Sequence, residues 1–322
     1  MKRKIHFMAL TALVLMLLPL PARAARLLIP AGSLVGLQLE DSTVTVAAFD
    51  EIYGGPAREA GLEIGDEILK IGESPVDSPG DIRRILSRSP AQVAVTVTRN
   101  GRPRTVHITP TETDRGRRLG VYLRQGITGI GTVTWYDPDT GRFGTLGHGV
   151  STREGLLVPK TGGRIYDAEL MTVNPGKIGR PGQLKGGADG DRPCGTLLRN
   201  TPQGVFGVTR RGWLGEPLPT AAFEDVHPGP AVIRSTVVPG APREYSVELL
   251  KIYPQNRTDS RNFLLRITDP QLLTHTGGIV QGMSGSPIIQ DGRLVGAVTH
   301  VMVSDPTVGY GIFIGNMLDA AA

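Results

Sequence analysis

Glycine and proline divide most of this chain into short segments, and this spacing constrains the fold more than any other feature of the sequence. Among 322 residues there are 43 glycines and 25 prolines. Between them lie short runs rich in Val, Ile and Thr, such as 128–136, 231–238 and 294–303. Short strands separated by turn residues are typical of β-barrels and β-sandwiches, and the length is sufficient for two domains. We therefore expect a mainly β fold.

Residues 1–26 have the pattern of a signal peptide or membrane anchor. Three basic residues at positions 2–4 precede an apolar run from about residue 5 to residue 20, and Ala22-Arg23-Ala24 follows. A basic start, an apolar run that is short for a spanning helix, and a small-x-small site are typical of a secretory leader. We expect export across a membrane, with the leader either removed or kept as an anchor.

Charge and cysteine content argue against a nucleic-acid-binding protein and against a cysteine peptidase. The formal net charge is +5, but residues 1–24 contain four basic residues and no acidic one, so the remainder is close to neutral. A nearly neutral body offers no electrostatic footprint for nucleic acid. Cys194 is the single cysteine, which excludes an intramolecular disulfide and leaves a cysteine-peptidase interpretation without a motif. We expect neither a metal nor a cofactor.

Residues 27–113 have the pattern of a compact α/β module. Ser78-Pro79-Gly80-Asp81 predicts a capped helix that ends near Arg88. Asn100-Gly101 predicts a hairpin turn between two strands. The polar and charged residues 110–119 then predict a linker to the rest of the chain.

This module resembles a PDZ domain. The resemblance rests on Gly54-Gly55-Pro56-Ala57, on Ala60-Gly61-Leu62, on Gly65-Asp66-Glu67-Ile68-Leu69 and on the loop Val35-Gly36-Leu37. It implies binding of C-termini or extended peptides by strand addition. In that case the backbone near Val35, Gly36 and Leu37 would hold the terminal carboxylate.

The run Gly282-Met283-Ser284-Gly285-Ser286-Pro287 is the strongest functional signal in the chain. Chymotrypsin-like peptidases present a nucleophilic serine in such a frame, because small residues let amides near Gly282 and Ser284 point at one oxyanion. A serine hydroxyl needs a base. His148, in a small-residue frame at the end of a predicted strand, is the favoured base, and His300 is the alternative. Residues 114–322 are therefore expected to form a chymotrypsin-like (double β-barrel type) serine peptidase domain.

The acid that would orient the histidine is less clear from the residues alone. Chymotrypsin-like enzymes place it between the histidine and the serine along the chain. Asp269, in Thr268-Asp269-Pro270, meets this condition at the end of a predicted strand. The same tripeptide also fits a helix cap or a turn, so both interpretations stay open on these grounds.

Four segments resemble the stage IV sporulation protein B family of serine peptidases from endospore-forming bacteria. They are 146–149, 268–270, 276–290 and 296–301. The resemblance also includes the order of leader, PDZ domain and peptidase domain. It implies a triad of His148, Asp269 and Ser284. It further implies secretion into the space between forespore and mother cell, self-cleavage, and cleavage of a regulator of a membrane-embedded metalloprotease, which triggers late sporulation gene expression.

Two other functions compete with an active exported endopeptidase. One is a PDZ-type peptide-binding scaffold or signalling protein whose peptidase-like domain is inactive. The complete serine and histidine motifs argue against it. The other is a periplasmic quality-control protease, but those enzymes normally place the PDZ domain after the protease domain.

Overall fold

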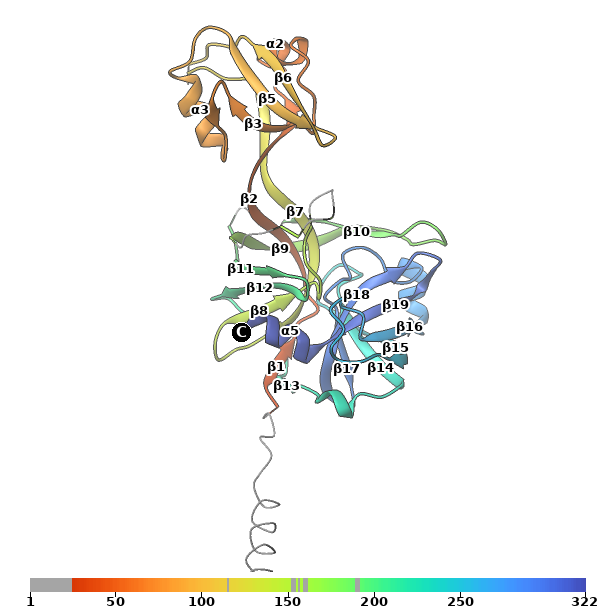
Figure 1. Cartoon of the computed structure of the whole chain (residues 1–322). Coiled ribbons are helices and arrows are strands. Elements are labelled where there is room, and N and C mark those ends of the chain that lie inside the picture. The colour runs from red at the N-terminus through yellow and green to blue at the C-terminus, as the bar shows by residue number, and fades with distance from the viewer. Residues whose placement is uncertain (1–24, 115, 152–154, 156, 159–161, 189–191) are drawn as a thin grey trace, which may run out of the picture.

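The computed structural model describes residues 25–322 except 115, 152–154, 156, 159–161 and 189–191. The expected leader falls almost entirely within residues 1–24, which lie outside this description. Within the described part of the chain, no helix is long and apolar enough to cross a membrane. The fold is mainly β (Figure 1).

The first β-barrel arises because six strands pair in a closed ring. Each strand is antiparallel to its neighbours, and the ring closes where the first strand pairs with the last. Its interior is filled by buried Val35, Val133, Phe143, Ile165 and Val205. In ring order the strands are β2 (Leu34–Phe49), β7 (Val121–Tyr136), β8 (Arg142–Thr145), β12 (Gly204–Thr209), β11 (Gly195–Thr201) and β9 (Gly163–Asn174). Three further strands extend this sheet: β1 (Leu27–Pro30), β13 (Leu218–Pro219) and β10 (Gln183–Ala188).

The second β-barrel is also closed and consists of the last six strands of the chain's described part. Inward and outward side chains alternate along β14, where Ala231, Ile233 and Ser235 are buried, as expected for strands with one face on a core. In ring order the strands are β14 (Gly229–Ser235), β15 (Arg243–Ile252), β16 (Phe263–Ile267), β19 (Asp305–Phe313), β18 (Arg293–Met302) and β17 (Pro287–Gln290). The short helices in this half are η1 (Phe223–Asp225), α4 (Pro270–Thr276) and α5 (Ile314–Ala321).

The PDZ-like module has its own core and confirms two local predictions. Ser78 caps the predicted helix, α3 (Pro79–Leu86), by accepting a hydrogen bond from the Asp81 amide. Asn100 and Gly101 have positive φ and form the turn between β5 (Val93–Arg99) and β6 (Arg102–Ile108). Its buried side chains include Val46, Ile68 and Val95. The elements between β2 and β7 are α2 (Gly55–Glu59), β3 (Glu67–Ile71), β4 (Ser74–Pro75), α3 (Pro79–Leu86), β5 (Val93–Arg99) and β6 (Arg102–Ile108).

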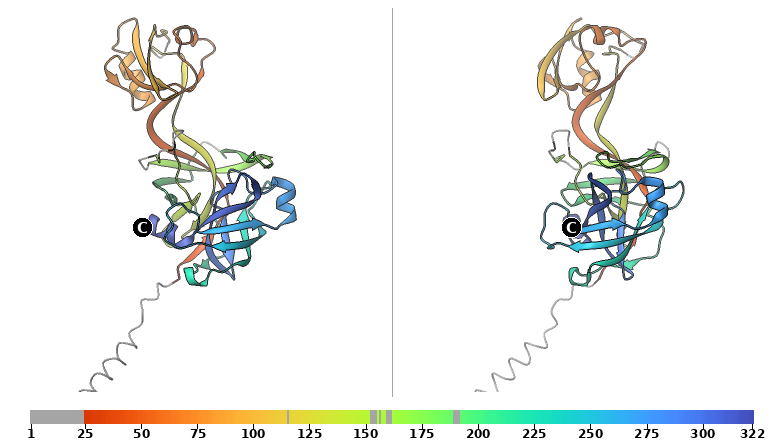
Figure 2. Two further views of the ribbon diagram at one scale, coloured as in Figure 1. Left: turned by 45° about the vertical axis from the view of Figure 1, so that its right-hand side comes forward. Right: turned by 90° about the vertical axis from the view of Figure 1, so that its right-hand side faces the viewer.

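The module is inserted into the first barrel and does not precede it. Strands β2 and β7 run from the barrel into the module as one antiparallel ribbon, which Figures 1 and 2 show as its only ribbon connection to the barrels. The pairing shifts register where Leu39 pairs with Ile127 and Val44 with Gln125. The expected boundaries, 27–113 and 114–322, therefore need correction: residues 27–39 belong to the barrel, and the module extends past residue 113 as far as residue 125. A strand shared by two domains has no signature in local sequence pattern.

Candidate active site

Ser284 lies in a loop that bonds to both barrels. Its carbonyl accepts a hydrogen bond from the Thr132 amide of β7 at 3.0 Å, and the carbonyl of Gly282 accepts one from the Thr132 hydroxyl at 2.8 Å. Gly285 has φ +96°, and a Cβ there would overlap the Thr132 carbonyl oxygen. Only glycine fits at this position, so the small residues after Ser284 allow the serine loop to dock against the other barrel.

The backbone N–H groups of Gly282 and Ser284 are both available to bind a ligand. The intervening Met283 amide donates to the Val280 carbonyl, and the Gly285 amide donates to the Val298 carbonyl. By contrast, the amides of Gly282 and Ser284 have no acceptor among the residues that the structure describes. Two free amides that flank one residue are the donor arrangement that an oxyanion requires.

His148 follows β8 on a turn made by two residues in the left-handed region. Leu146 has φ 68° and Gly147 has φ 69°. Leucine rarely adopts this conformation, and such strain is concentrated at functional sites. The Nδ1 atom of His148 lies 2.9 Å from the Gly149 carbonyl, and burial lowers the pKa of the imidazole. At neutral pH His148 is therefore uncharged, which is the state that a general base needs.

Ser284 and His148 line one cavity of about 450 Å³ between the barrels. In this structure the Ser284 hydroxyl donates to the Thr299 carbonyl of β18 at 2.9 Å. A hydrogen bond to His148 would need rotation of the side chain; in unliganded enzymes catalytic hydrogen bonds often tighten only when substrate binds. Within the described part of the chain, no group of three His, Cys, Asp or Glu side chains is placed to hold a metal ion.

Asp269, the expected orienting acid, lies outside this cavity. One carboxylate oxygen accepts hydrogen bonds from the amides of Gln271 and Leu272, both at 2.9 Å, and the other accepts one from the Ser246 amide at 3.4 Å. The carboxylate thus caps α4, the second interpretation left open by the sequence. The structure brings His148 and Ser284 together and gives Asp269 no contact with either.

Asn200 is a residue of this site that no sequence motif identifies. It lies at the end of β11, and its side chain is buried. Its Oδ1 accepts from the Val150 amide at 2.9 Å, while its Nδ2 donates to the carbonyls of Val150 and Val158 at 2.8 and 3.1 Å. Asn200 therefore holds the segment after His148. Because these partners are some 40–50 positions away in the chain, no local motif could have identified it.

Val35, Gly36 and Leu37 do not form a peptide-binding loop. They lie in the barrel part of β2 and pair with β7 on one edge and with β9 on the other. With both edges occupied, these residues have no free backbone groups to receive an added strand, and the expected site has to be corrected.

The module instead offers residues 121–124 of β7 as a strand edge. These residues pair with β2 on one side only within the described chain. Helix α3 runs alongside, because Arg117 donates to the Leu86 carbonyl at its C-terminal end and Gln125 donates to the Asp77 carbonyl at its N-terminal end. A strand edge beside a helix is the arrangement in which PDZ domains receive a peptide.

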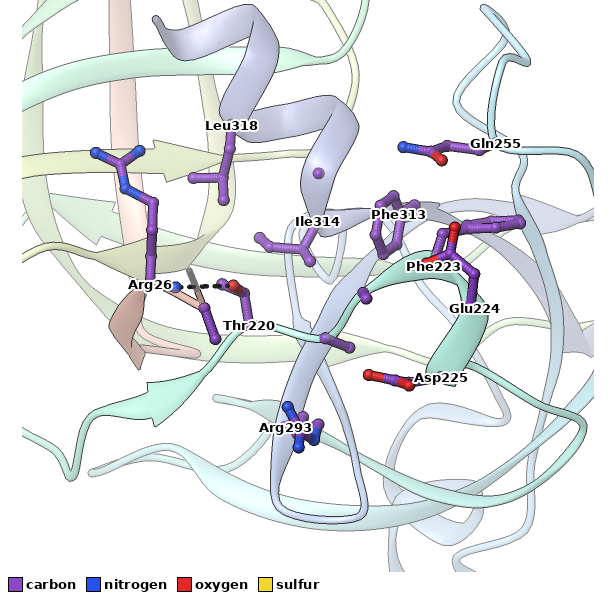
Figure 3. A pocket seen from close by; sticks show the side chains of 14 residues that line it. Arg26, Thr220, Phe223, Glu224, Asp225, Gln255, Arg293, Phe313, Ile314 and Leu318 are labelled. Carbon is purple, nitrogen blue, oxygen red and sulfur yellow. Dashed lines mark hydrogen bonds between the residues drawn. The ribbon is translucent and has the colours of Figure 1, made fainter. Parts of the chain in front are cut away.

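A larger cavity, of about 610 Å³, lies away from the serine (Figure 3). It is bounded by the start of the described chain, η1 and α5, and its lining includes Arg26, Phe223, Glu224, Phe313 and Leu318. Its described lining contains no histidine, and neither Ser284 nor His148 reaches it. The cavity between the barrels is therefore the one that fits peptidase chemistry.

Two closed six-stranded barrels with a serine and a histidine in the cavity between them define a chymotrypsin-like serine peptidase, here with an inserted PDZ domain. The family model for the SpoIVB peptidase S55 matches residues 115–318, and a PDZ domain model matches residues 51–99. This chain therefore belongs to the SpoIVB peptidase S55 family and is a serine peptidase.

Comparison with other proteins gives only distant matches. A search of curated proteins finds no match. The active form of Rv3671c protease from M. tuberculosis is 16% identical, with 61% of this chain and 75% of that chain covered and a TM-score of 0.38. The inactive form of Rv3671c protease is 14% identical, with 60% and 84% covered and a TM-score of 0.35. The fold is assigned from the strand pairing.

Proposed function

We propose that Ser284 is the nucleophile of an endopeptidase, that His148 is its general base, and that the amides of Gly282 and Ser284 form the oxyanion hole. The observation that carries this proposal is the cavity between the barrels, which both side chains line beside two amides without a described acceptor. Proton transfer to His148 frees the serine oxygen to attack a peptide carbonyl, and the amides stabilise the resulting negative charge.

The lining of this cavity indicates the substrate. Apart from the two histidines, its described lining contains no charged or titratable side chain. An apolar lining binds apolar side chains and leaves a buried charge without a partner. The substrates are therefore peptide segments with apolar residues around the scissile bond. The apolar lining residues include Leu37, Leu39, Ile130, Leu146, Val150, Ile279, Val280 and Val301.

Family membership and the leader pattern also support a proposal for the biological role. The enzyme is exported, stays associated with a membrane or is secreted into the space between forespore and mother cell, and acts in sporulation. There it cleaves itself and a regulator of a membrane-embedded metalloprotease. Support comes from membership of the SpoIVB peptidase S55 family and from the basic and apolar pattern of residues 1–24.

The PDZ domain recruits protein substrates. A C-terminal or extended peptide adds to the edge at residues 121–124, and the tether raises the local concentration of the attached chain at the cleft. The peptide is either part of a substrate or the processed end of the enzyme itself.

Self-cleavage tests this function. Purified wild-type protein is incubated with the Ser284→Ala variant as substrate, and fragments are identified by mass spectrometry. We expect the wild type to cleave the variant and the variant alone to stay intact, with His148→Ala as inactive as Ser284→Ala because nucleophile and base act as a unit. A wild type that cleaves nothing and resists a fluorophosphonate probe would instead support an inactive, peptide-binding scaffold.

A further inference from the structure

The turn between β9 and β10, residues 175–182, reaches from the first barrel to the second (Figure 1). The Gly176 amide donates to the Thr276 carbonyl at the end of α4 at 2.8 Å. The Gly179 amide donates to the Val303 carbonyl, just after β18, at 2.9 Å. The β9–β10 turn is therefore fixed to the second barrel at two points.

The end of this turn also holds the residue that precedes the proposed oxyanion hole. The Gln281 amide donates to the Gly182 carbonyl at 2.9 Å, and the Gln281 carbonyl accepts from the Leu184 amide at 2.8 Å. The Gln281 carbonyl and the Gly282 N–H belong to one planar peptide group, in which they point in opposite directions. The bond from Leu184 therefore turns the Gly282 N–H away from β10.

A cavity of about 360 Å³ lies between the β9–β10 turn and Gln281. Gln281 also lines the cavity that contains Ser284, so the two cavities are neighbours. The described lining of the smaller cavity includes two cations, Lys177 and Arg180, and no acidic side chain. The smaller cavity is thus positively charged, in contrast to the apolar cavity beside it.

Lys177 and Arg180 project together because their backbones form an antiparallel bridge. Each amide donates to the other residue's carbonyl, at 2.9 and 2.8 Å, and residues paired in this way place their side chains on one face. Both residues are exposed. None of the ion pairs within the described residues involves either of them. The pair therefore offers two positive charges to a ligand.

We propose that Lys177 and Arg180 form a subsite for an acidic side chain of the substrate. This inference rests on the proposed roles of Ser284 and of the Gly282 amide. A peptide whose scissile carbonyl oxygen lies at the Gly282 amide passes beside Gln281. Because an extended chain advances about 3.3 Å per residue, a side chain a few residues from the scissile bond reaches the smaller cavity. Asp or Glu at that position is attracted by the two cations, whereas Lys or Arg is repelled.

The test uses peptides that share one apolar cleavage site and carry either Glu or Gln at each nearby position in turn. We expect the wild type to cleave the Glu peptide with a kcat/KM about 5-fold higher at one position, the size of effect that an exposed ion pair produces. High salt should reduce this preference. In the Lys177→Gln, Arg180→Gln double variant the Glu and Gln peptides should have equal kcat/KM values.

Two further variants separate charge from structure. The Lys177→Glu, Arg180→Glu double variant should prefer Lys over Gln at the same position, an inversion that a merely structural role of the turn would not produce. Arg104→Gln removes an exposed positive charge from β6 of the PDZ domain and should keep the wild-type preference for Glu.

The proposal is overturned if no position favours Glu, or if the preference persists in the Lys177→Gln, Arg180→Gln variant. Equal losses on all peptides in both double variants would also overturn it, because the turn would then only position Gln281. Labelling of the wild type by a fluorophosphonate probe distinguishes these failures from failure of the proposed function. A labelled wild type that cleaves Glu and Gln peptides equally would disprove the subsite alone.

Discussion

The carboxylate of Asp269 makes its hydrogen bonds at the start of α4, with three backbone amides. Because asparagine caps helices about as well as aspartate, we expect Asp269→Asn to keep both stability and kcat. Asp269→Ala should lose about 1 kcal/mol of unfolding free energy and still turn over normally when folded. Denaturant unfolding and steady-state kinetics measure the two effects. A fall in kcat of about 10⁴-fold in Asp269→Asn would instead make this residue the orienting acid.

The two partly buried histidines, His148 and His300, predict how stability depends on pH. Burial lowers the pKa of His148, and it lowers the pKa of His300 from 6.5 to about 4. Below about pH 6.5 the unfolded chain therefore binds protons that the folded protein does not bind. The free energy of unfolding consequently falls as the pH drops from about 6.5 towards 4. Thermal unfolding of the wild type and of His300→Phe across this range checks the sign. The variant should lose less stability on acidification; a steeper loss in the variant contradicts this account.

At the level of residues, the sequence could predict what local chemistry dictates. The serine and its glycines, and the histidine after a strand, are recognisable because their backbone requirements are met by adjacent residues. His300 appeared only as an alternative base, and Asn200 did not appear. Their places beside His148 come from contacts between segments far apart in the chain, such as the neighbouring rings of His148 and His300.

The end of β11 is joined to the segment after His148 by Asn200. Replacing Asn200 with Leu leaves buried backbone groups of Val150 and Val158 unpaired, at a cost of about 1–3 kcal/mol for each group that water does not reach. We expect a lower melting temperature and also a lower kcat in the folded fraction, because the His148 segment is no longer held. Substrate binding, measured as KM, should change less. A destabilised variant with wild-type kcat would show that other contacts position His148.

Most individual elements could be predicted, including the capped helix α3 and the β5–β6 hairpin. The elements that were misassigned are the two long strands. The sequence pattern of residues 34–49 predicts a strand throughout, and nothing in it reveals that its two halves belong to different domains. This is why Val35, Gly36 and Leu37 were expected to bind peptide, although both their edges are paired within the barrel.

At the scale of the whole molecule, strands β2 and β7 connect the PDZ domain to the cavity that contains Ser284. Leu37 and Leu39 of β2 and Gly129 and Ile130 of β7 line the cavity, while the other ends of the same strands form part of the PDZ domain. A peptide that adds to residues 121–124 therefore acts on strands that reach the active site. Truncation of the chain before Arg117 would remove β2 and open the barrel, so the domain has to be removed internally.

We expect a variant in which residues 40–126 are replaced by a short Asn-Gly hairpin turn to fold, because Leu39 and Ile127 already face each other across β2 and β7. It should still react with a serine-directed probe and cleave short peptides, but it should lose preference for protein substrates that carry a PDZ-binding terminus. Rates on a short peptide and on the Ser284→Ala protein provide the comparison. Equal rates for the variant and the wild type on both substrates would show that the PDZ domain has no part in substrate selection.

The central claim is that Ser284 is a nucleophile activated by His148. The most direct measurement is the reaction of the full-length protein with a fluorophosphonate probe, followed by peptide mapping. We predict one label per molecule, on Ser284, with labelling abolished in Ser284→Ala and strongly slowed in His148→Ala. Absence of label on the wild type, or a label on another residue that persists in Ser284→Ala, would contradict the account.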